Sequence, residues 1–84
     1  MTVRERIIKV VSLATLINYP SDKLSSDVFP KIVWGYQPDT NEFSIIISEK
    51  SEYTRFFVNC TKRKAYEELG EIIEKLEIIK EGQI

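Results

Sequence analysis

The chain has 84 residues, of which 43% are hydrophobic and 30% are charged, and its formal net charge at pH 7 is −1. That length allows one domain with one core, residues 1–84, and that composition excludes an intrinsically disordered chain. The near-zero net charge excludes a uniformly basic nucleic-acid binder, so any nucleic-acid surface must be a local patch.

The first predicted element is a capped helix of about 15 residues, followed by a turn-rich segment. Thr2 and Glu5 have the spacing of a capping box, and a wide apolar face follows them. Asn18 suits the C-terminal end of this helix, and Pro20 blocks its extension. We expect residues 19–30 to form an ordered loop or a short turn of helix. The apolar residues expected to anchor this segment are Leu24, Val28 and Phe29.

Three strand-like runs come next, separated by short polar turns. They cover residues 31–37, 42–48 and 53–60, with turn residues at 38–41 and 49–52. Because connections this short join neighbouring antiparallel strands, the runs predict a three-stranded meander.

Two aromatic residues, Trp34 and Tyr36, alternate on the first of these strands. They could form a stacking surface for nucleic-acid bases. An alternating aromatic pair on a strand more often belongs to the core, and that is our expectation here.

The last predicted element is a helix over residues 61–80 with Thr61 as its cap. A single apolar stripe runs along it, and acidic residues occupy the opposite side. The stripe could seed a coiled coil, but we expect it to pack on the sheet. The order α-β-β-β-α therefore predicts an α+β fold, a three-stranded antiparallel meander with both helices on one face. The stripe consists of Ala65, Leu69, Ile72, Leu76 and Ile79.

The residues needed for common catalytic and metal-binding chemistry are missing. The chain has no histidine, one cysteine (Cys60) and only isolated glycines. Histidine-assisted nucleophiles, cysteine-based zinc sites and glycine-rich phosphate loops are thereby excluded. We expect a protein that is not an enzyme and that uses no metal or cofactor.

The same composition bears on localisation. No apolar run approaches the roughly 20 residues of a membrane span, and the N-terminus lacks the cleavage site of a secretory signal. A lone cysteine favours a reducing compartment. We therefore expect a cytoplasmic protein with no membrane partner.

The order of elements and the second half of the sequence resemble the double-stranded RNA-binding domain. That family has Gly-Pro-x-His before its second strand, a Phe opening that strand, and Ser-Lys-Lys-x-Ala-Lys at the start of its last helix. The corresponding residues here are 37–40 (Gln-Pro-Asp-Thr), Phe43, and 61–66 (Thr-Lys-Arg-Lys-Ala-Tyr). Gly70 falls where the family keeps a small residue facing the first helix. The chain departs from the family by replacing the loop glycine, the loop histidine and the last basic residue.

The resemblance implies a nucleic-acid surface for double-stranded RNA. Lys62, Arg63 and Lys64 would lie across the major groove, and the loop with Pro38 and Thr40 would meet a minor groove. The alternative is a solvated basic turn, balanced by the acidic residues one turn later in the predicted helix.

The third strand carries a different candidate surface. Tyr53, Arg55, Phe56 and Phe57 place aromatic residues on both faces of a strand that ends the meander. Such an edge invites pairing with another chain unless something guards it. The residues 19–30 could fold over it instead. We expect a protein-interaction or dimerisation domain that binds itself or another protein through this strand, with double-stranded RNA binding as the alternative.

Overall fold

The computed structural model describes residues 2–19, 30–49 and 52–82. Five elements follow one another in the order α-β-β-β-α, as the sequence predicts. They are α1 (Val3–Asn18), β1 (Lys31–Gln37), β2 (Glu42–Ser48), β3 (Tyr53–Asn59) and α2 (Ala65–Gly82). The structure is therefore of the α+β class, and its layout is compatible with the topology of the double-stranded RNA-binding domain.

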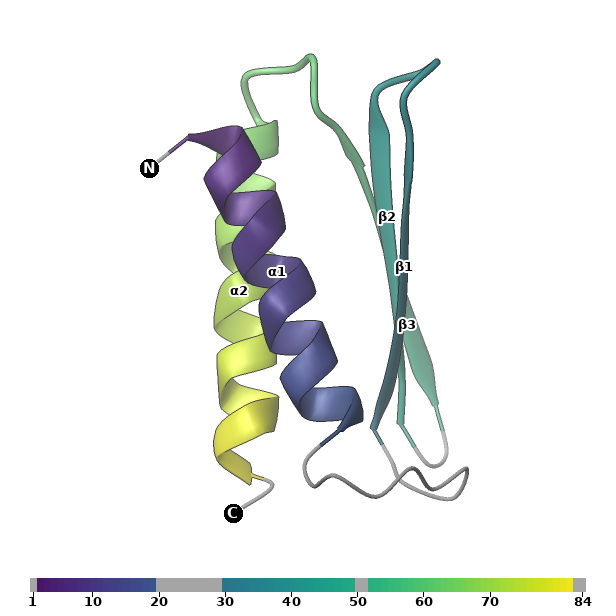
Figure 1. The fold of residues 1–84 in the computed structure, drawn as a ribbon, viewed down its shortest axis with the longest axis vertical. Helices are drawn as coiled ribbons and strands as arrows, with labels where there is room; N and C mark the ends of the chain where they lie inside the picture. The colour runs from purple at the N-terminus through teal and green to yellow at the C-terminus, as the bar shows by residue number, and fades with distance from the viewer. Residues whose placement is uncertain (1, 20–29, 50–51, 83–84) are drawn as a thin grey trace.

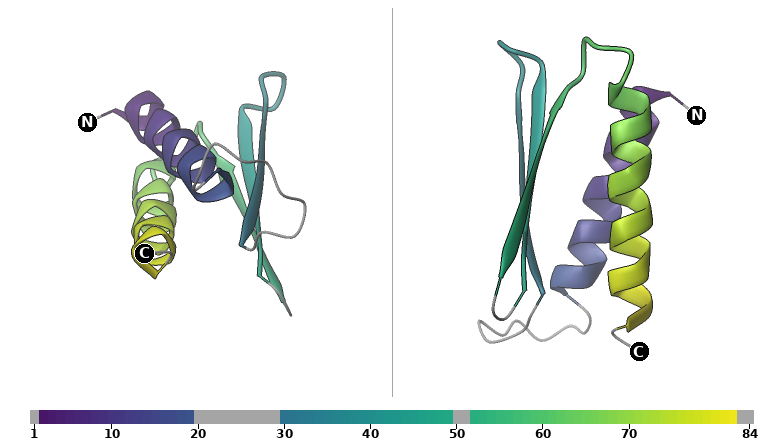
Figure 2. Two further views of the ribbon diagram at one scale, coloured as in Figure 1. Left: turned by 60° about the horizontal axis from the view of Figure 1, so that its bottom comes forward. Right: turned by 180° about the vertical axis from the view of Figure 1, so that it is seen from behind.

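The three strands form one antiparallel sheet in the order β1-β2-β3. Figure 1 shows α1 and α2 side by side in one layer, with the sheet as the second layer. The two further views agree that both helices lie on the same side of the sheet (Figure 2). The predicted meander with both helices on one face is confirmed.

The capping box at the start of α1 forms as its spacing predicts. The Thr2 hydroxyl accepts from the amide of Glu5, and the Glu5 carboxylate accepts from the amide of Thr2, each at 3.1 Å. These bonds pair amides that have no partner within a helix. The pKa of the Glu5 carboxyl is lowered, because hydrogen bonds from the backbone amide and the side-chain hydroxyl of Thr2 favour its charged form.

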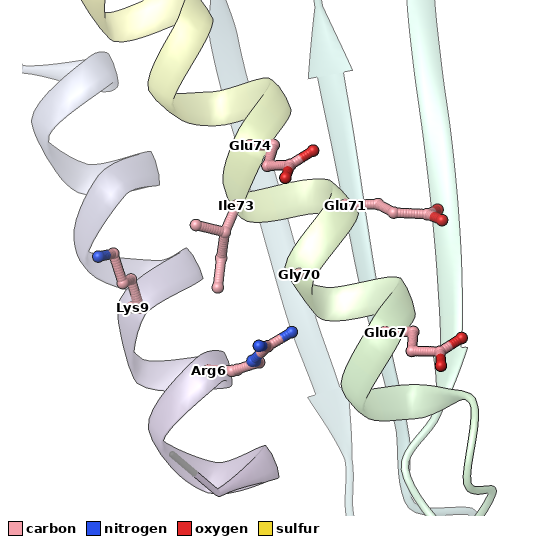
Figure 3. Close-up of a pocket in the computed structure, with 7 residues that line it drawn as sticks. All are labelled: Arg6, Lys9, Glu67, Gly70, Glu71, Ile73 and Glu74. Atoms are coloured by element: carbon pink, nitrogen blue, oxygen red, sulfur yellow. The ribbon is translucent and has the colours of Figure 1, made fainter.

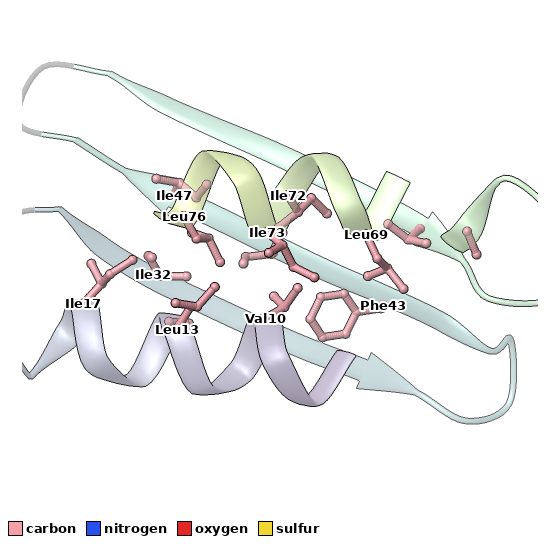
Figure 4. Packing of buried hydrophobic residues seen from close by; sticks show 14 residues of the cluster. Val10, Leu13, Ile17, Ile32, Phe43, Ile47, Leu69, Ile72, Ile73 and Leu76 are labelled. Carbon is pink, nitrogen blue, oxygen red and sulfur yellow. The ribbon is translucent and has the colours of Figure 1, made fainter. Parts of the chain in front are cut away.

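The core lies between the helix layer and one face of the sheet (Figure 4). It forms because the apolar faces of both helices and the alternate residues of the strands meet there. The stripe on α2 packs inside the chain, as predicted, and not in a coiled coil. The buried cluster comprises Val10, Leu13, Ala14, Ile17, Ile32, Phe43, Ile45, Ile47, Val58, Ala65, Leu69, Ile72, Ile73 and Leu76.

Two predicted boundaries are wrong at the passage from β3 to α2. The strand ends at Asn59, and the helix begins at Ala65, so Thr61 does not cap it. The amide and hydroxyl of Thr61 both donate to the side-chain oxygen of Asn59, at 3.0 and 2.6 Å. This local turn competes with helix formation, as short polar side chains commonly do. We call residues 60–64 the helix-entry turn and residues 38–41 the hairpin turn.

The expectation that Trp34 and Tyr36 are core residues is wrong. Their register with Ile45 and Phe43 places them on the face that carries the core. They are nevertheless 44% and 45% exposed. The reason is that β1 is an edge strand that α1 approaches only at its beginning, where Asn18 bonds to Ile32, because the start of α1 lies farther from the sheet (Figure 1).

Leu24, Val28 and Phe29, the predicted anchors of the 19–30 segment, lie outside the described residues. So does most of the segment that could have covered the third strand. None of the helices in the described ranges is long and apolar enough to span a membrane.

Candidate interaction surfaces

The outer edge of β3 has backbone groups that no described residue pairs with. In an antiparallel ladder, successive residues direct their N–H and C=O groups alternately to the two sides of the strand. The Cys60 amide donates to the Asn41 carbonyl at 2.9 Å, which continues the β2–β3 ladder. Even-numbered residues of β3 therefore bond to β2, and Tyr53, Arg55 and Phe57 direct their backbone groups to the open edge. Within residues 2–19, 30–49 and 52–82, no backbone group forms a hydrogen bond with the backbone of these three residues.

The four predicted interface residues fall on opposite faces of this strand. Tyr53 and Phe57 lie on the open face and are 68% and 62% exposed. The guanidinium carbon of Arg55 lies 5.7 Å from the centre of the Phe57 ring on that face. Phe56 points to the helix side, where it is half-buried and the Lys75 ammonium lies 5.9 Å from its ring centre.

The open face of the sheet extends the apolar surface beyond β3. Register places Val33 beside Ile46 and Ile46 beside Arg55, in one row across the three strands. Val33 is 62% exposed, and Ile46 is half-buried. Neither α1 nor α2 lies on this face (Figure 2). Apolar groups on an uncovered face of this kind often mark an interaction site.

The opposite edge, on β1, is partly closed by α1. The Asn18 side chain accepts from the amide of Ile32 at 2.7 Å and donates to its carbonyl at 2.8 Å. It thus takes the place of one residue of a neighbouring strand. Trp34 and Tyr36 direct their backbone groups to the same edge by the same alternation. The two edges of the sheet therefore differ, because a side chain from α1 already occupies the start of one of them.

The residues of the predicted nucleic-acid surface gather at one end of the molecule. Pro38 and Thr40 lie in the hairpin turn, and Lys62, Arg63 and Lys64 lie in the helix-entry turn. All five are exposed. Both turns lie at the upper end of the view in Figure 1, beside the start of α1. The bond between the Cys60 amide and the Asn41 carbonyl joins the two turns.

Carboxylates close to this end reduce its positive potential. Asp39 lies inside the hairpin turn, and Glu67 and Glu68 lie in the first turn of α2. The Glu68 amide donates to the Lys64 carbonyl at 2.9 Å, so Lys64 directly precedes the helix. The basic side chains thus adjoin the positive end of the α2 dipole, but two acidic residues already occupy the first turn.

The contact between the two helices contains a half-buried arginine, Arg6, that sequence reasoning missed. The guanidinium of Arg6 donates to the Tyr66 carbonyl at 2.6 Å and lies 3.5 Å from the centre of the Tyr66 ring. Figure 3 shows it directed across the groove toward Gly70, while Glu67 and Glu71 point away from α1. A Cβ atom on Gly70 would lie 2.3 Å from the Arg6 Nη1 atom. The small residue expected at this position is therefore explained by a close approach of α1.

Two other kinds of functional site, a nucleophile and a metal site, concern Cys60 and the acidic side chains of the described residues. Burial raises the pKa of the Cys60 thiol, and a hydrogen bond with the backbone of Phe43 offsets part of that rise. A thiol with a raised pKa is a weak nucleophile at neutral pH. Among the described residues, no group of three or more His, Cys, Asp or Glu side chains could hold a metal ion.

Comparisons with known proteins give no relative for this chain. No family model matches the sequence, and no curated protein and no solved structure matches it. The surfaces described above are therefore the grounds for a functional proposal.

Proposed function

We propose that this chain is a non-catalytic protein-interaction domain that binds another chain by strand addition at the β3 edge. The observation that supports this is the row of outward-facing backbone groups on Tyr53, Arg55 and Phe57. Main-chain hydrogen bonds supply affinity in this mode, and the alternating side chains supply specificity. Here the flanking side chains are two exposed aromatic rings and one guanidinium.

The β3 edge is better suited to this role than the β1 edge. An added strand at β1 would meet the Asn18 side chain, which already bonds both backbone groups of Ile32. The described residues place no such group on β3. An edge that no described residue covers, with exposed aromatic side chains, is an aggregation risk in a protein of net charge −1, and a bound partner removes that risk.

A proline at position 55 tests strand addition selectively. Because the Arg55 amide points away from β2, proline there removes no bond of the protein's own sheet. It does remove the central donor of the open edge and places a ring against any incoming strand. Arg55→Ala is the matched control, since it removes the same side chain but keeps the amide.

The unmodified protein, Arg55→Pro and Arg55→Ala are compared by light scattering over a concentration series and by affinity capture from an extract of the source organism. We expect Arg55→Pro to lose association in at least one of these assays and Arg55→Ala to keep most of it. Thermal unfolding of both variants verifies that the fold is intact. Equal association of the proline and alanine variants would contradict strand addition at β3.

Binding of double-stranded RNA is the second candidate function. It is supported by the resemblance at residues 37–40 and 61–66 and by the position of both turns at one end of the molecule. On this proposal, Lys62, Arg63 and Lys64 contact phosphates, and Pro38 and Thr40 approach a minor groove.

A salt-titrated binding assay against duplex RNA, duplex DNA and single strands tests the RNA proposal. Lys62→Ala should weaken duplex RNA binding and lower the salt slope by about one unit, the effect of one lost phosphate contact. Lys80→Ala, which removes the same charge at the far end of α2, is the control and should change neither quantity. Absence of duplex RNA binding at low salt would end this proposal.

A further inference from the structure

We propose that the partner at the β3 edge is a second copy of this chain, paired antiparallel about a two-fold axis at Phe56. The two sheets would then join into one sheet of six strands, with all helices on the same face. This inference rests on the proposed strand addition and adds to it the identity of the partner and the register of the pair.

The alternation of backbone groups limits the registers that are possible. In an antiparallel pair, residues that exchange hydrogen bonds must both direct their groups to the interface. Odd-numbered residues of one β3 can therefore pair only with odd-numbered residues of the other. Of these registers, only the one centred on Phe56 overlaps the whole of Tyr53–Asn59 in both copies. It pairs Arg55 with Phe57 of the second copy, twice by symmetry, which gives about four central backbone hydrogen bonds.

Charge favours the same register. Arg55 is the only charged residue of β3. An axis at Arg55 would place two guanidinium groups directly opposite each other, and like charges in that position are destabilising. An axis at Phe56 instead places each Arg55 opposite Phe57 of the second copy. Each guanidinium, which already lies 5.7 Å from its own Phe57 ring, then gains a second ring as a cation–π partner.

The ends and the inner face of the pair also fit. Tyr53 would lie opposite Asn59 of the second copy. The Asn59 carbonyl already accepts from the Lys62 amide at 3.1 Å, whereas the Asn59 amide has no backbone partner among the described residues. On the helix side, the two Phe56 rings would meet at the axis. The Lys75 ammonium near each ring brings two like charges toward the axis, which opposes the pairing, whereas the net charge of −1 per chain leaves little overall repulsion.

Disulfide trapping tests the register directly. In a Cys60→Ala background, the Cα atoms of residue 56 and its symmetry mate would be about 4.5 Å apart, within the range of a disulfide. Phe56→Cys should then cross-link to itself under mild oxidation. Because that change removes a half-buried ring, an equimolar mixture of Arg55→Cys and Phe57→Cys serves as a second test at two exposed positions. The mixture should cross-link several-fold more than either variant alone.

The outcomes separate this inference from the proposed function. Preferential self-cross-linking of Arg55→Cys would overturn the register. A wild-type protein that is monomeric by light scattering at high micromolar concentration would overturn the second copy as partner. In that case, capture of a partner that Arg55→Pro abolishes and Arg55→Ala retains would still support strand addition. A dimer that is unaffected by Arg55→Pro would contradict both proposals.

Discussion

Replacing Gly70 by alanine should destabilise the protein, although alanine is the better helix former. Alanine in place of glycine within a helix gains about 1 kcal/mol. The new Cβ atom, however, would lie 2.3 Å from Arg6 Nη1 and 3.4 Å from Arg6 Cζ, so the guanidinium must move. It would leave a hydrogen bond of 2.6 Å to the Tyr66 carbonyl and a position 3.5 Å from the Tyr66 ring centre.

The expected size follows from these contacts. A hydrogen bond from a charged donor contributes about 1.5–3 kcal/mol, and a partly exposed cation–π contact contributes about 0.5–1 kcal/mol. Arg6 also has a buried Nε atom without a hydrogen-bond partner within the described parts of the chain, so its present position is not free of cost. After subtraction of the helix-propensity gain, Gly70→Ala should lower the free energy of unfolding by about 1–3 kcal/mol.

The assay is a double-mutant cycle of Gly70→Ala and Arg6→Ala, with unfolding by urea followed by circular dichroism at low protein concentration. In the Arg6→Ala background the obstacle is gone, so Gly70→Ala should stabilise by about 1 kcal/mol. The coupling free energy should therefore be about 2–4 kcal/mol, the sum of the two Arg6 contacts that the new Cβ atom displaces. If Gly70→Ala stabilises the protein equally in both backgrounds, the close packing of Arg6 on Gly70 is wrong.

Three further predictions concern single contacts. Asn41 has a φ of 55°, so Asn41→Ala should destabilise the protein by about 1 kcal/mol in chemical denaturation, while Asn41→Gly should be tolerated. Asn18→Ala removes both bonds to the backbone of Ile32 and should lower the free energy of unfolding by about 1–3 kcal/mol, whereas Asn18→Asp, which keeps the acceptor, should lose less. Because the folded-state pKa of Glu5 is lowered, the stability it contributes is present above its unfolded pKa and is lost as the pH falls through its folded pKa. A series of melting temperatures below about pH 5 should show a smaller loss for Thr2→Ala than for the unmodified protein, and an equal loss would contradict the capping box.

The elements of the fold were predictable because local patterns determine them. The Thr2–Glu5 spacing indicates a helix start that the structure reproduces atom by atom. Alternation in residues 42–48, interrupted only by Ile46, predicts the face on which Phe43, Ile45 and Ile47 are all buried. The capping box depends only on residues that are neighbours in the sequence, and the buried face of a strand follows from the two-residue period of its side chains.

The errors arose where contacts distant in sequence decide the outcome. Trp34 alternates like a core residue, but its exposure depends on how far α1 extends over β1, and no local pattern encodes that. Thr61 is a residue type that commonly caps a helix, but here its amide and hydroxyl bond to the Asn59 side chain in a turn. The sequence did contain a signal for this turn, because an asparagine side chain can bond to the backbone two residues further along the chain.

The sequence identified residues of the candidate surfaces, but it did not show which of their backbone groups and side chains already have a partner. The sequence indicates that β3 is an edge, yet which of its amides are free depends on the ladder that Cys60 and Asn41 continue. The closure of the β1 edge by Asn18 has no sequence signal other than the suitability of asparagine for a helix end. The sequence around Arg6 does not distinguish it from an exposed arginine, because its contact with Gly70 depends on how α2 packs against α1.

Amide hydrogen exchange, resolved by residue and measured over a range of protein concentrations, tests the role of the β3 edge most directly. The amides of Thr54, Phe56 and Val58 bond to β2 and should be protected at every concentration. The amides of Arg55 and Phe57 should exchange readily in dilute protein and become protected as the second copy, or another bound partner, adds its strand. Protection of the odd-numbered amides that stays low at every concentration and in the presence of any captured partner would contradict strand addition at β3.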